Sequence, residues 1–233
     1  MQYTDLKLAT DQTHFTCNGQ NIFNKTFVQA LKFHAEGLAA VQDESGWYHI
    51  NMQGSELYAQ RYDRTFGFYC NRAAVIENGK WWHIDTNGDA VYENAYAWCG
   101  NFQENRCTVR NHKNQYFHID LYGKPIYNEK YWYAGDFKDG FACVKLQNGT
   151  YKHIDEQGQF LNEKHFLDLG IFHKGIANAK DEKGWFHINR YGNALYNERY
   201  QQIEVFYNGC ALVENFECEK LIINELGETL LVL

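Results

Sequence analysis

A glycine recurs along the whole chain at almost constant spacing, and this repeat constrains the fold more than any other feature. The glycines lie 34 or 35 residues apart, at Gly19, Gly54, Gly88, Gly123, Gly158, Gly192 and Gly227. Five of them close one phrase, which reads ring or Lys, His, Ile, Asp or Asn, two residues and Gly; weaker copies, His14-Phe15-Thr16 and Ile222-Ile223-Asn224, precede the first and last. A fixed period of this length is the signature of a stacked repeat. We therefore expect seven units in a single repeat domain over residues 1–233.

The residues around each glycine indicate short antiparallel strands. Asp, Asn or Thr at the first place of a four-residue corner and Gly at its fourth favour a type I turn, so a hairpin should follow each His-Ile segment. Beyond the corner a short strand carries an apolar residue and usually a ring, and further ring residues follow at fixed intervals as core positions. In the fifth unit we align Phe160-Leu161 with this strand, one residue early, which places His165 in the next ring column.

A last strand closes each unit. A small residue lies two places before its final apolar residue, and Gly or Asn lies four places before it, at positions 37, 71, 105, 140, 175 and 209. Only glycine and asparagine adopt a positive φ at low cost, so we expect a bend there. Asn78-Gly79 and Asn148-Gly149 are hairpin signals in the loop that follows. The pattern predicts an all-β chain with three to four antiparallel strands per unit and almost no helix.

Two architectures fit such units. Seven near-equal units favour a β-propeller-like arrangement, although the spacing of 35 residues is short beside the roughly 40–45 residues of a WD-type blade. An open β-solenoid is the alternative, because the degenerate first and last copies would serve as caps. The chain contains one proline, Pro125, and no Gly/Ser-rich segment, so the sequence offers no linker at which to divide it.

These phrases resemble the WG repeat, also called KWG, of bacterial proteins, whose unit reads F-x-x-G-x-A-x-V, a gap, W-G-x-I-D-x-x-G, an apolar strand and a tyrosine. Phe137 to Val144 match the first phrase, and Gly184 to Asn189 with Gly192 resemble the second. The Trp-Gly pair is largely missing, and a histidine stands where a tyrosine or similar residue is usual. This His-rich variant is similar to the repeat region that precedes a methyltransferase domain in some bacterial proteins. The resemblance implies an interaction or scaffold module with no agreed ligand.

The composition argues against several classes of protein. Mean hydropathy is -0.59, and no stretch approaches the roughly 18 apolar residues of a membrane-spanning helix. The first residues lack the basic and apolar regions of a signal peptide, so we expect a cytoplasmic protein, with export into a host cell left open. Lys and Arg number 22 against 29 Asp and Glu, a net charge of -7 without a basic cluster. This balance argues against a nucleic-acid partner and favours a neutral or basic partner surface. Seven cysteines without a C-x-x-C pair favour reduced thiols.

The candidate binding residues lie in the His-Ile strands. Alternate residues of a strand share a face, so each histidine should lie beside the aromatic residue two places earlier. The five pairs are Trp47 with His49, Trp81 with His83, Tyr116 with His118, Tyr151 with His153, and Trp185 with His187. Apolar residues on both faces indicate a covered strand, in which each histidine is structural and bonds the backbone of a neighbouring unit. The alternative is a recurring pocket of Trp or Tyr, His, and Asp or Asn that binds a sugar or a peptide ring.

Catalysis and metal binding have little support in the sequence. No local His/Cys spacing resembles a zinc motif, and no P-loop, dinucleotide fingerprint or nucleophile elbow occurs, so we assign no catalytic residue, metal or cofactor. A Cys-His pair formed in space, with Cys70 or Cys99, stays open. We therefore predict a non-enzymatic scaffold module whose partner is another protein. A multivalent carbohydrate-binding module is the alternative, and we expect neither a membrane nor a nucleic acid as partner.

Overall fold

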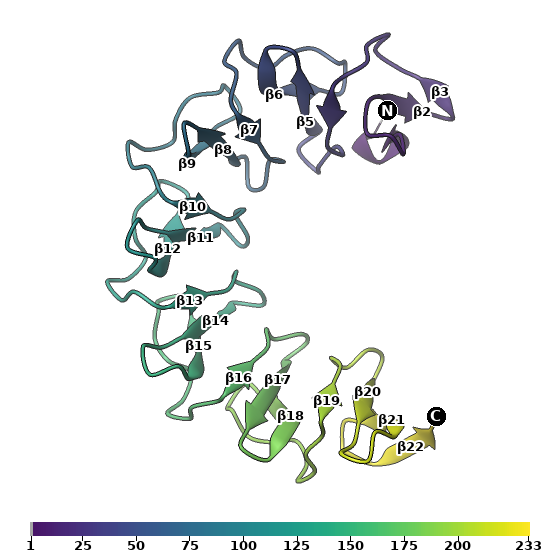
Figure 1. The fold of residues 1–233 in the computed structure, drawn as a ribbon, viewed down its shortest axis with the longest axis vertical. Helices are drawn as coiled ribbons and strands as arrows, with labels where there is room; N and C mark the ends of the chain where they lie inside the picture. The colour runs from purple at the N-terminus through teal and green to yellow at the C-terminus, as the bar shows by residue number, and fades with distance from the viewer. Residues whose placement is uncertain (1) are drawn as a thin grey trace. The chain divides into compact units, whose positions relative to one another are not determined.

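The computed structural model describes residues 2–233 and contains seven small antiparallel β-sheets, one for each repeat (Figure 1). The first three sheets comprise β1 (Leu6–Leu8), β2 (Phe15–Cys17) and β3 (Gln20–Asn21); β4 (Gln29–Ala30), β5 (Leu38–Asp43) and β6 (Gly46–Asn51); and β7 (Arg64–Thr65), β8 (Ala73–Glu77) and β9 (Lys80–Ile84). The next three comprise β10 (Trp98–Cys99), β11 (Arg106–Arg110) and β12 (Tyr116–Asp120); β13 (Tyr133–Ala134), β14 (Phe141–Lys145) and β15 (Tyr151–Asp155); and β16 (Asp168–Leu169), β17 (Ile176–Asp181) and β18 (Gly184–Asn189). The seventh has four strands, β19 (Gln202–Ile203), β20 (Cys210–Glu214), β21 (Lys220–Asn224) and β22 (Thr229–Val232).

The predicted all-β fold is confirmed. Within residues 2–233 the only helical element is one turn of 3-10 helix, η1 (Tyr3–Asp5), and each sheet has the three or four antiparallel strands that the sequence predicts. Contacts group the chain into two compact units: residues up to 114 with 118–125, and residues 115–117 with 126–233. A buried apolar cluster lies in each unit. The single repeat domain expected over residues 1–233 stays a prediction.

Each repeat contributes the same set of buried side chains. The predicted ring column is buried in six repeats, at Phe33, Phe68, Phe102, Phe137, Phe172 and Phe206. An isoleucine in the third strand of a sheet lies opposite a small residue in the second, as Ile50 lies opposite Ala39 and Ile188 opposite Ala177. All four of these residues have no exposed surface. A small residue is favoured here because larger side chains would overpack a closely filled core.

The bends and corners follow the glycine and asparagine pattern. All six predicted bend positions, at residues 37, 71, 105, 140, 175 and 209, have a positive φ. At the corner after β9, Gly88 donates its N–H to the Asp85 carbonyl at 3.1 Å, and the Asp85 side chain accepts the N–H groups of Asn87 and Asp89 at 2.8 and 3.1 Å. The first corner residue is therefore Asp or Asn because its side chain binds the turn backbone, and the fourth is Gly because φ is +84°.

The predicted register of the fifth unit is wrong. Leu161 donates its N–H to the His153 carbonyl at 3.0 Å, as Leu57 does to His49, so Asn162 rather than Leu161 occupies the position of the ring. Phe166, not His165, pairs with Tyr151 in the way that Tyr62 pairs with Trp47. The backbone hydrogen bonds continue without a deletion, and one ring is simply replaced by an asparagine. Sequence alignment followed the aromatic character of Phe160 instead of the spacing.

Gly88, at a corner, and Gly79, in the loop between β8 and β9, allow the effect of ring contact to be separated from the effect of backbone strain. A Cβ on Gly88 would lie 2.6 Å from the Tyr58 ring of the preceding repeat, whereas a Cβ on Gly79 would meet nothing within 4 Å. Both residues have a positive φ. We expect Gly88→Ala to lower the free energy of unfolding by roughly 2–4 kcal/mol and Gly79→Ala by about 1 kcal/mol. Urea unfolding of both variants checks this, and equal losses would show that the ring contact is unimportant.

Candidate functional site

The five candidate histidines are buried in the fold. His49, His83, His118, His153 and His187 are between 0 and 4% exposed. Four of them bond a carbonyl oxygen 17 residues further along the chain through Nε2: Phe66 at 2.7 Å, Gly100 at 3.0 Å, Gly170 at 2.7 Å and Glu204 at 2.8 Å. Each of these carbonyl groups belongs to the next repeat. These four histidines therefore connect one sheet to the following one, as the structural interpretation of the sequence predicts for them.

A tyrosine nine residues on occupies the other nitrogen of three of these rings. Tyr58 bonds Nδ1 of His49, Tyr196 bonds Nδ1 of His187, and the Tyr92 hydroxyl lies 2.6 Å from Nδ1 of His83. A carbonyl oxygen can only accept, so the neutral ring carries its hydrogen on Nε2 and accepts the tyrosine O–H at Nδ1. Both nitrogens of these three rings are used by the fold.

Burial keeps the histidines neutral. It lowers the pKa of His49, His83, His153 and His187 to about 4, an effect only partly opposed by the carbonyl each ring binds. Burial also raises the pKa of the tyrosine partners well above its usual value. These groups therefore form a neutral hydrogen-bonded chain at physiological pH, without a charge to attract a ligand.

The first and last repeats replace the whole His-Tyr pair by apolar residues. Phe15, not His14, occupies the histidine position of the first repeat, because its carbonyl accepts the Ile22 N–H as the His49 carbonyl accepts that of Leu57. The Phe15 and Phe23 rings lie 6.0 Å apart, edge to face. In the last repeat Ile222 pairs with Leu231, nine residues on. The prediction that His14 begins a weak copy of the histidine column is corrected accordingly.

The other polar members of the expected pocket are also held by the fold. The corner carboxylate or amide of Asn51, Asp85, Asp120, Asp155 and Asn189 accepts N–H groups of its own turn. Three buried thiols are similarly constrained. Burial raises the pKa of Cys99 and Cys143 to about 12, and Cys107, 3.6 Å from His83 Nε2, donates to the Gly100 carbonyl at 3.3 Å. Such thiols stay protonated and are poor nucleophiles.

The aromatic residues of the candidate pairs differ in exposure. Trp47 is 2% exposed and has the Arg64 guanidinium 4.7 Å from its ring centre. Trp81 is half-buried; it stacks on Phe66 at 5.3 Å with 15° between the planes, and Trp98 lies 6.4 Å away. In this part of the chain, then, the partners of the rings are other rings and an arginine, not the buried histidines.

In the second compact unit the rings lie beside lysines. Tyr116, Tyr151 and Trp185 are half-buried. Lys145 Nζ lies 5.0 Å from the Tyr151 ring centre and Lys180 Nζ lies 5.5 Å from that of Trp185. Each lysine occupies the strand next to its ring, in direct cross-strand register. The structure therefore brings rings and ammonium groups together on a partly exposed surface.

Three exposed apolar residues beside this surface were missed by the sequence analysis. Trp132, Tyr133 and Leu167 are 58, 46 and 51% exposed. Trp132 directly follows the buried ring of Tyr131, and Leu167 directly follows that of Phe166. Tyr133 is the first residue of β13. The signal available in the sequence was that Trp132 and Leu167 occupy equivalent repeat positions 35 residues apart. It was hidden because an apolar residue next to a core ring is ordinarily taken as core.

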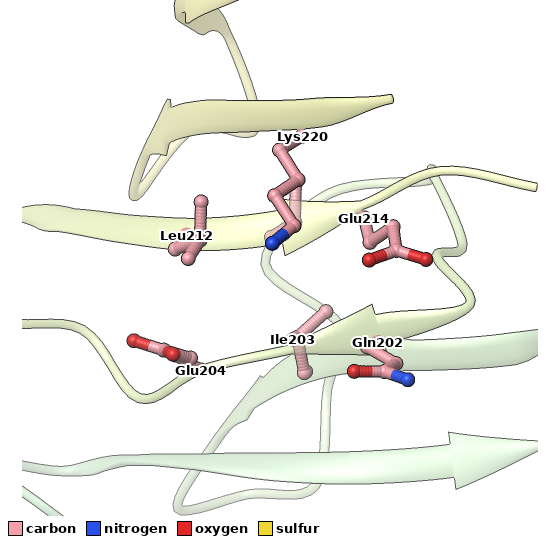
Figure 2. A pocket seen from close by; sticks show the side chains of 7 residues that line it. Gln202, Ile203, Glu204, Leu212, Glu214 and Lys220 are labelled. Atoms are coloured by element: carbon pink, nitrogen blue, oxygen red, sulfur yellow. The ribbon is translucent and has the colours of Figure 1, made fainter. Parts of the chain in front are cut away.

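A small pocket lies on the last sheet (Figure 2). Its volume is about 140 Å³ and its lining residues are Gln202, Ile203, Glu204, Leu212, Val213, Glu214 and Lys220. Pockets for drug-sized ligands usually have volumes of roughly 300–1,000 Å³, so this pocket is too small for one. Lys220 occupies the position that Trp185 has in the preceding repeat, and no ring fills the space.

The described residues, 2–233, contain neither a metal-binding cluster nor a membrane-spanning helix. No group of three or more His, Cys, Asp and Glu side chains in this range is placed to hold a metal ion. No helix in the described chain has the length and apolar character needed to cross a membrane.

The repeats match a known family model. The model of the WG containing repeat matches residues 50–81 and 119–151. These two stretches of the chain are therefore similar to the WG containing repeat. Both matches have the same frame, since each begins at the isoleucine after a buried histidine and ends at the next partly exposed ring, Trp81 or Tyr151. No curated protein matches the sequence.

Solved structures confirm the predicted fold class of the chain. BamB from Moraxella catarrhalis is 14% identical with a TM-score of 0.51, covering 92% of this chain and 76% of its own. Hsv2p of Kluyveromyces lactis is 9% identical with a TM-score of 0.52, over 93% and 88% of the two chains. A eukaryotic initiation factor is 11% identical with a TM-score of 0.62, over 98% and 72%. BamB and Hsv2 have β-propeller-like folds, so the predicted β-propeller-like class is confirmed at the level of the fold.

The buried histidines make stability depend on pH. Their pKa is about 4 in the folded protein and about 6.5 in the unfolded chain, so between these values the unfolded chain binds more protons. We expect the free energy of unfolding to be highest above about pH 6.5 and to fall as pH decreases towards 4. Urea unfolding between pH 4.5 and 7.5 measures this. A stability that is constant or rises on acidification would contradict the neutral, buried state of the rings.

The hydrogen bond between His83 and Tyr92 can be tested with the natural apolar pair as a guide. Tyr92→Phe leaves Nδ1 of His83 without its donor in a buried site, so we expect a loss of roughly 1–3 kcal/mol. The double variant His83→Phe/Tyr92→Phe reproduces the pair formed by Phe15 and Phe23. We expect it to cost at least about 1 kcal/mol less than the two single losses added together. A double-mutant cycle of urea unfolding checks this, and strict additivity would show that the two residues do not act as a pair.

Proposed function

We propose that this WG-type repeat protein is a non-enzymatic interaction module that binds another protein in the cytoplasm. The binding surface would be the exposed side chains at the end of each repeat where the second and third strands of the sheet are joined, which we call the hairpin end. Trp132 and Leu167 lie there. The resemblance noted in the sequence extends this proposal to a bacterial protein of the His-rich type found ahead of some methyltransferase domains. Proteins with β-propeller-like repeat folds typically act as scaffolds for other proteins, which supports the proposal at the level of the fold.

The observation that carries the proposal is the contrast between the recurring polar residues of the repeat, which the fold engages, and the exposed apolar residues of two repeats. The histidines, tyrosines and corner carboxylates are engaged by the fold. The side chains left at the surface near β13 and β16 are large and apolar, with Trp132 58% exposed. Aromatic residues of this kind are enriched at protein interfaces and are poor general acids or bases.

A multivalent carbohydrate-binding module is the second candidate. The half-buried rings of Trp81 and Trp98, 6.4 Å apart, support it, because a sugar can stack on an indole face. The surroundings of the rings in the second compact unit favour a protein, since Lys145 and Lys180 lie over the faces that a sugar would need.

Affinity capture with matched baits tests the proposed function. We expect native protein to retain a stoichiometric protein partner from the lysate of its own cells, and the variant Trp132→Ser/Tyr133→Ser to lose at least about 90% of it, because aromatic anchors dominate interface energy. Tyr191→Ser is the control. Tyr191 is 71% exposed. It lies in the corner after β18, at the opposite end of the sheet from the loop that joins β17 to β18, so this bait should retain the partner.

Two outcomes would overturn the proposal. Native bait that retains no protein but binds glycans at several equivalents, with loss in Trp81→Ala, would establish the carbohydrate alternative. Equal capture by the native and Trp132→Ser/Tyr133→Ser baits, with both folded by circular dichroism, would show that the partner binds elsewhere on the chain.

A further inference from the structure

Two lysines in the second compact unit have ring contacts and no carboxylate partner. Lys145 Nζ lies over Tyr151 and Lys180 Nζ over Trp185, at 5.0 and 5.5 Å. No ion pair with a carboxylate is recorded in the described chain for either side chain. An ammonium group held against a ring face keeps its charge while losing conformational freedom. Both lysines therefore offer a fixed positive charge to a ligand.

The two lysines occupy the same place in consecutive repeats. Tyr133, Lys145 and Tyr151 form one cross-strand row over β13, β14 and β15, and Asp168, Lys180 and Trp185 form the same row over β16, β17 and β18. An exposed apolar residue adjoins each row, since Trp132 donates its N–H to the Lys145 carbonyl at 3.0 Å and Leu167 to the Lys180 carbonyl at 2.8 Å. We call these side chains the lysine-ring patch: Trp132, Lys145, Tyr151, Leu167, Lys180 and Trp185.

The two rows belong to neighbouring sheets of one compact unit, which lie next to each other in Figure 1. His153 on β15 bonds the Gly170 carbonyl at 2.7 Å, and the Cys143 thiol on β14 donates to the Leu169 carbonyl at 3.2 Å. These buried bonds fix the first row against the second. The patch is therefore a rigid surface on which the order Lys, ring and apolar residue occurs twice.

The lysines are not required by the repeat. The position of Lys145 and Lys180 is occupied by Gln42, Ile76, Arg110 and Glu214 in four other repeats, all in the same register with the first strand. The fold tolerates neutral, apolar and acidic residues there. A lysine in these two repeats thus reflects a property of the surface rather than a requirement of the sheet.

The one carboxylate in the rows forms no ion pair with either lysine of the patch in the described chain. Asp168 lies opposite Lys180 in the register, yet its Oδ1 accepts the Leu169 N–H at 2.8 Å, and it forms no ion pair with the lysine. The chain as a whole carries a net charge of -7, which favours a basic partner at long range. The patch is a local exception, and close contacts rather than net charge decide which side chains it can accept.

We propose that the lysine-ring patch binds an extended acidic peptide segment of the partner protein, with carboxylates on Lys145 and Lys180 and apolar side chains on Trp132 and Leu167. This inference rests on the proposed function and names the chemistry of its partner. Charge complementarity selects the carboxylates, and the apolar side chains gain by covering the two exposed residues. A neutral sugar does not use the ammonium charges and finds the ring faces of Tyr151 and Trp185 already occupied.

A defined peptide probe tests this proposal. The probe is a fluorescein-labelled twelve-residue peptide in which glutamate alternates with leucine and tyrosine, and binding is measured by fluorescence anisotropy with the full chain. We expect saturable binding that weakens as salt rises, and at least about a 10-fold loss of affinity in Lys145→Glu/Lys180→Glu, because like charges then oppose the probe. Trp132→Ser/Leu167→Ser should lose affinity without losing the salt dependence.

Matched controls separate local from general charge effects. Lys138→Glu/Lys174→Glu makes the same change of net charge in the same two repeats, but both residues lie in the turns before β14 and β17, at the end of the repeat opposite the patch. This variant should bind the probe as the native protein does. Two further peptides, one with lysine for glutamate and one with serine and glycine for the apolar residues, should bind at least about 10-fold more weakly.

Several results would overturn the inference. The patch is refuted if the native protein does not bind the acidic probe, if Lys145→Glu/Lys180→Glu binds it with unchanged affinity, or if the basic or non-apolar peptide binds equally well. The lysate capture distinguishes this failure from that of the proposed function. A partner retained by both the native and Lys145→Glu/Lys180→Glu baits leaves the interaction module standing with a different contact surface, whereas no retained protein removes the proposed function itself.

Discussion

The structure depends on one buried hydrogen-bond chain, which runs from a tyrosine hydroxyl through a neutral imidazole to a carbonyl of the next repeat. At His49, His83 and His187 the tyrosine lies nine residues after the histidine, and the carbonyl lies 17 residues after it. A buried nitrogen without a partner is costly, so a change of length in this segment would break two bonds at once. The segment from Gly100 to His118 is one residue longer than that from Phe66 to His83. The alternation between 34 and 35 residues therefore falls in the hairpin, where an extra residue breaks no bond between repeats.

The same constraint explains how the repeat varies. Where the histidine is absent, at Phe15 and Ile222, the partner nine or so residues on is also apolar, at Phe23 and Leu231. The two polar groups are replaced together, because a buried hydroxyl or imidazole alone would be unsatisfied, whereas a pair of apolar groups packs without cost in hydrogen bonds. Neutrality of the buried chain has a further consequence. Its members are buried and use their polar hydrogens in bonds within the fold, so ligand chemistry has to come from side chains outside it.

The fold could be predicted from the sequence because its signals are local and repeated. Glycine at a corner with φ near +80°, Asn or Gly at each bend, and a small residue opposite a buried isoleucine each report a backbone or packing requirement that recurs in several repeats. Single departures were harder to place. The fifth unit was misaligned because Phe160 resembles the missing ring, and only the backbone bond of Leu161 shows that Asn162 stands in its place. His14 lies five residues before Gly19, as His49 lies before Gly54, but Ile22 lies only seven residues after Phe15 where Leu57 lies eight after His49. The first corner is therefore one residue shorter, and counting back from its glycine gives the wrong residue.

The candidate site was predictable only in part, and the reason is physical. Strand periodicity correctly places each histidine on the face of its aromatic neighbour, but it does not say what covers that face. The histidines and Trp47 are buried, while Tyr151 and Trp185, which also lie near the start of their strands, stay half-buried beside lysines. Those lysines are adjacent to the rings across a strand pair, not along the chain, so their association depends on register. The recurring polar residues of the repeat hold the sheets together, so the variable residues at the hairpin end determine what the repeat binds. In two consecutive repeats these variable residues combine a fixed positive charge with exposed apolar surface.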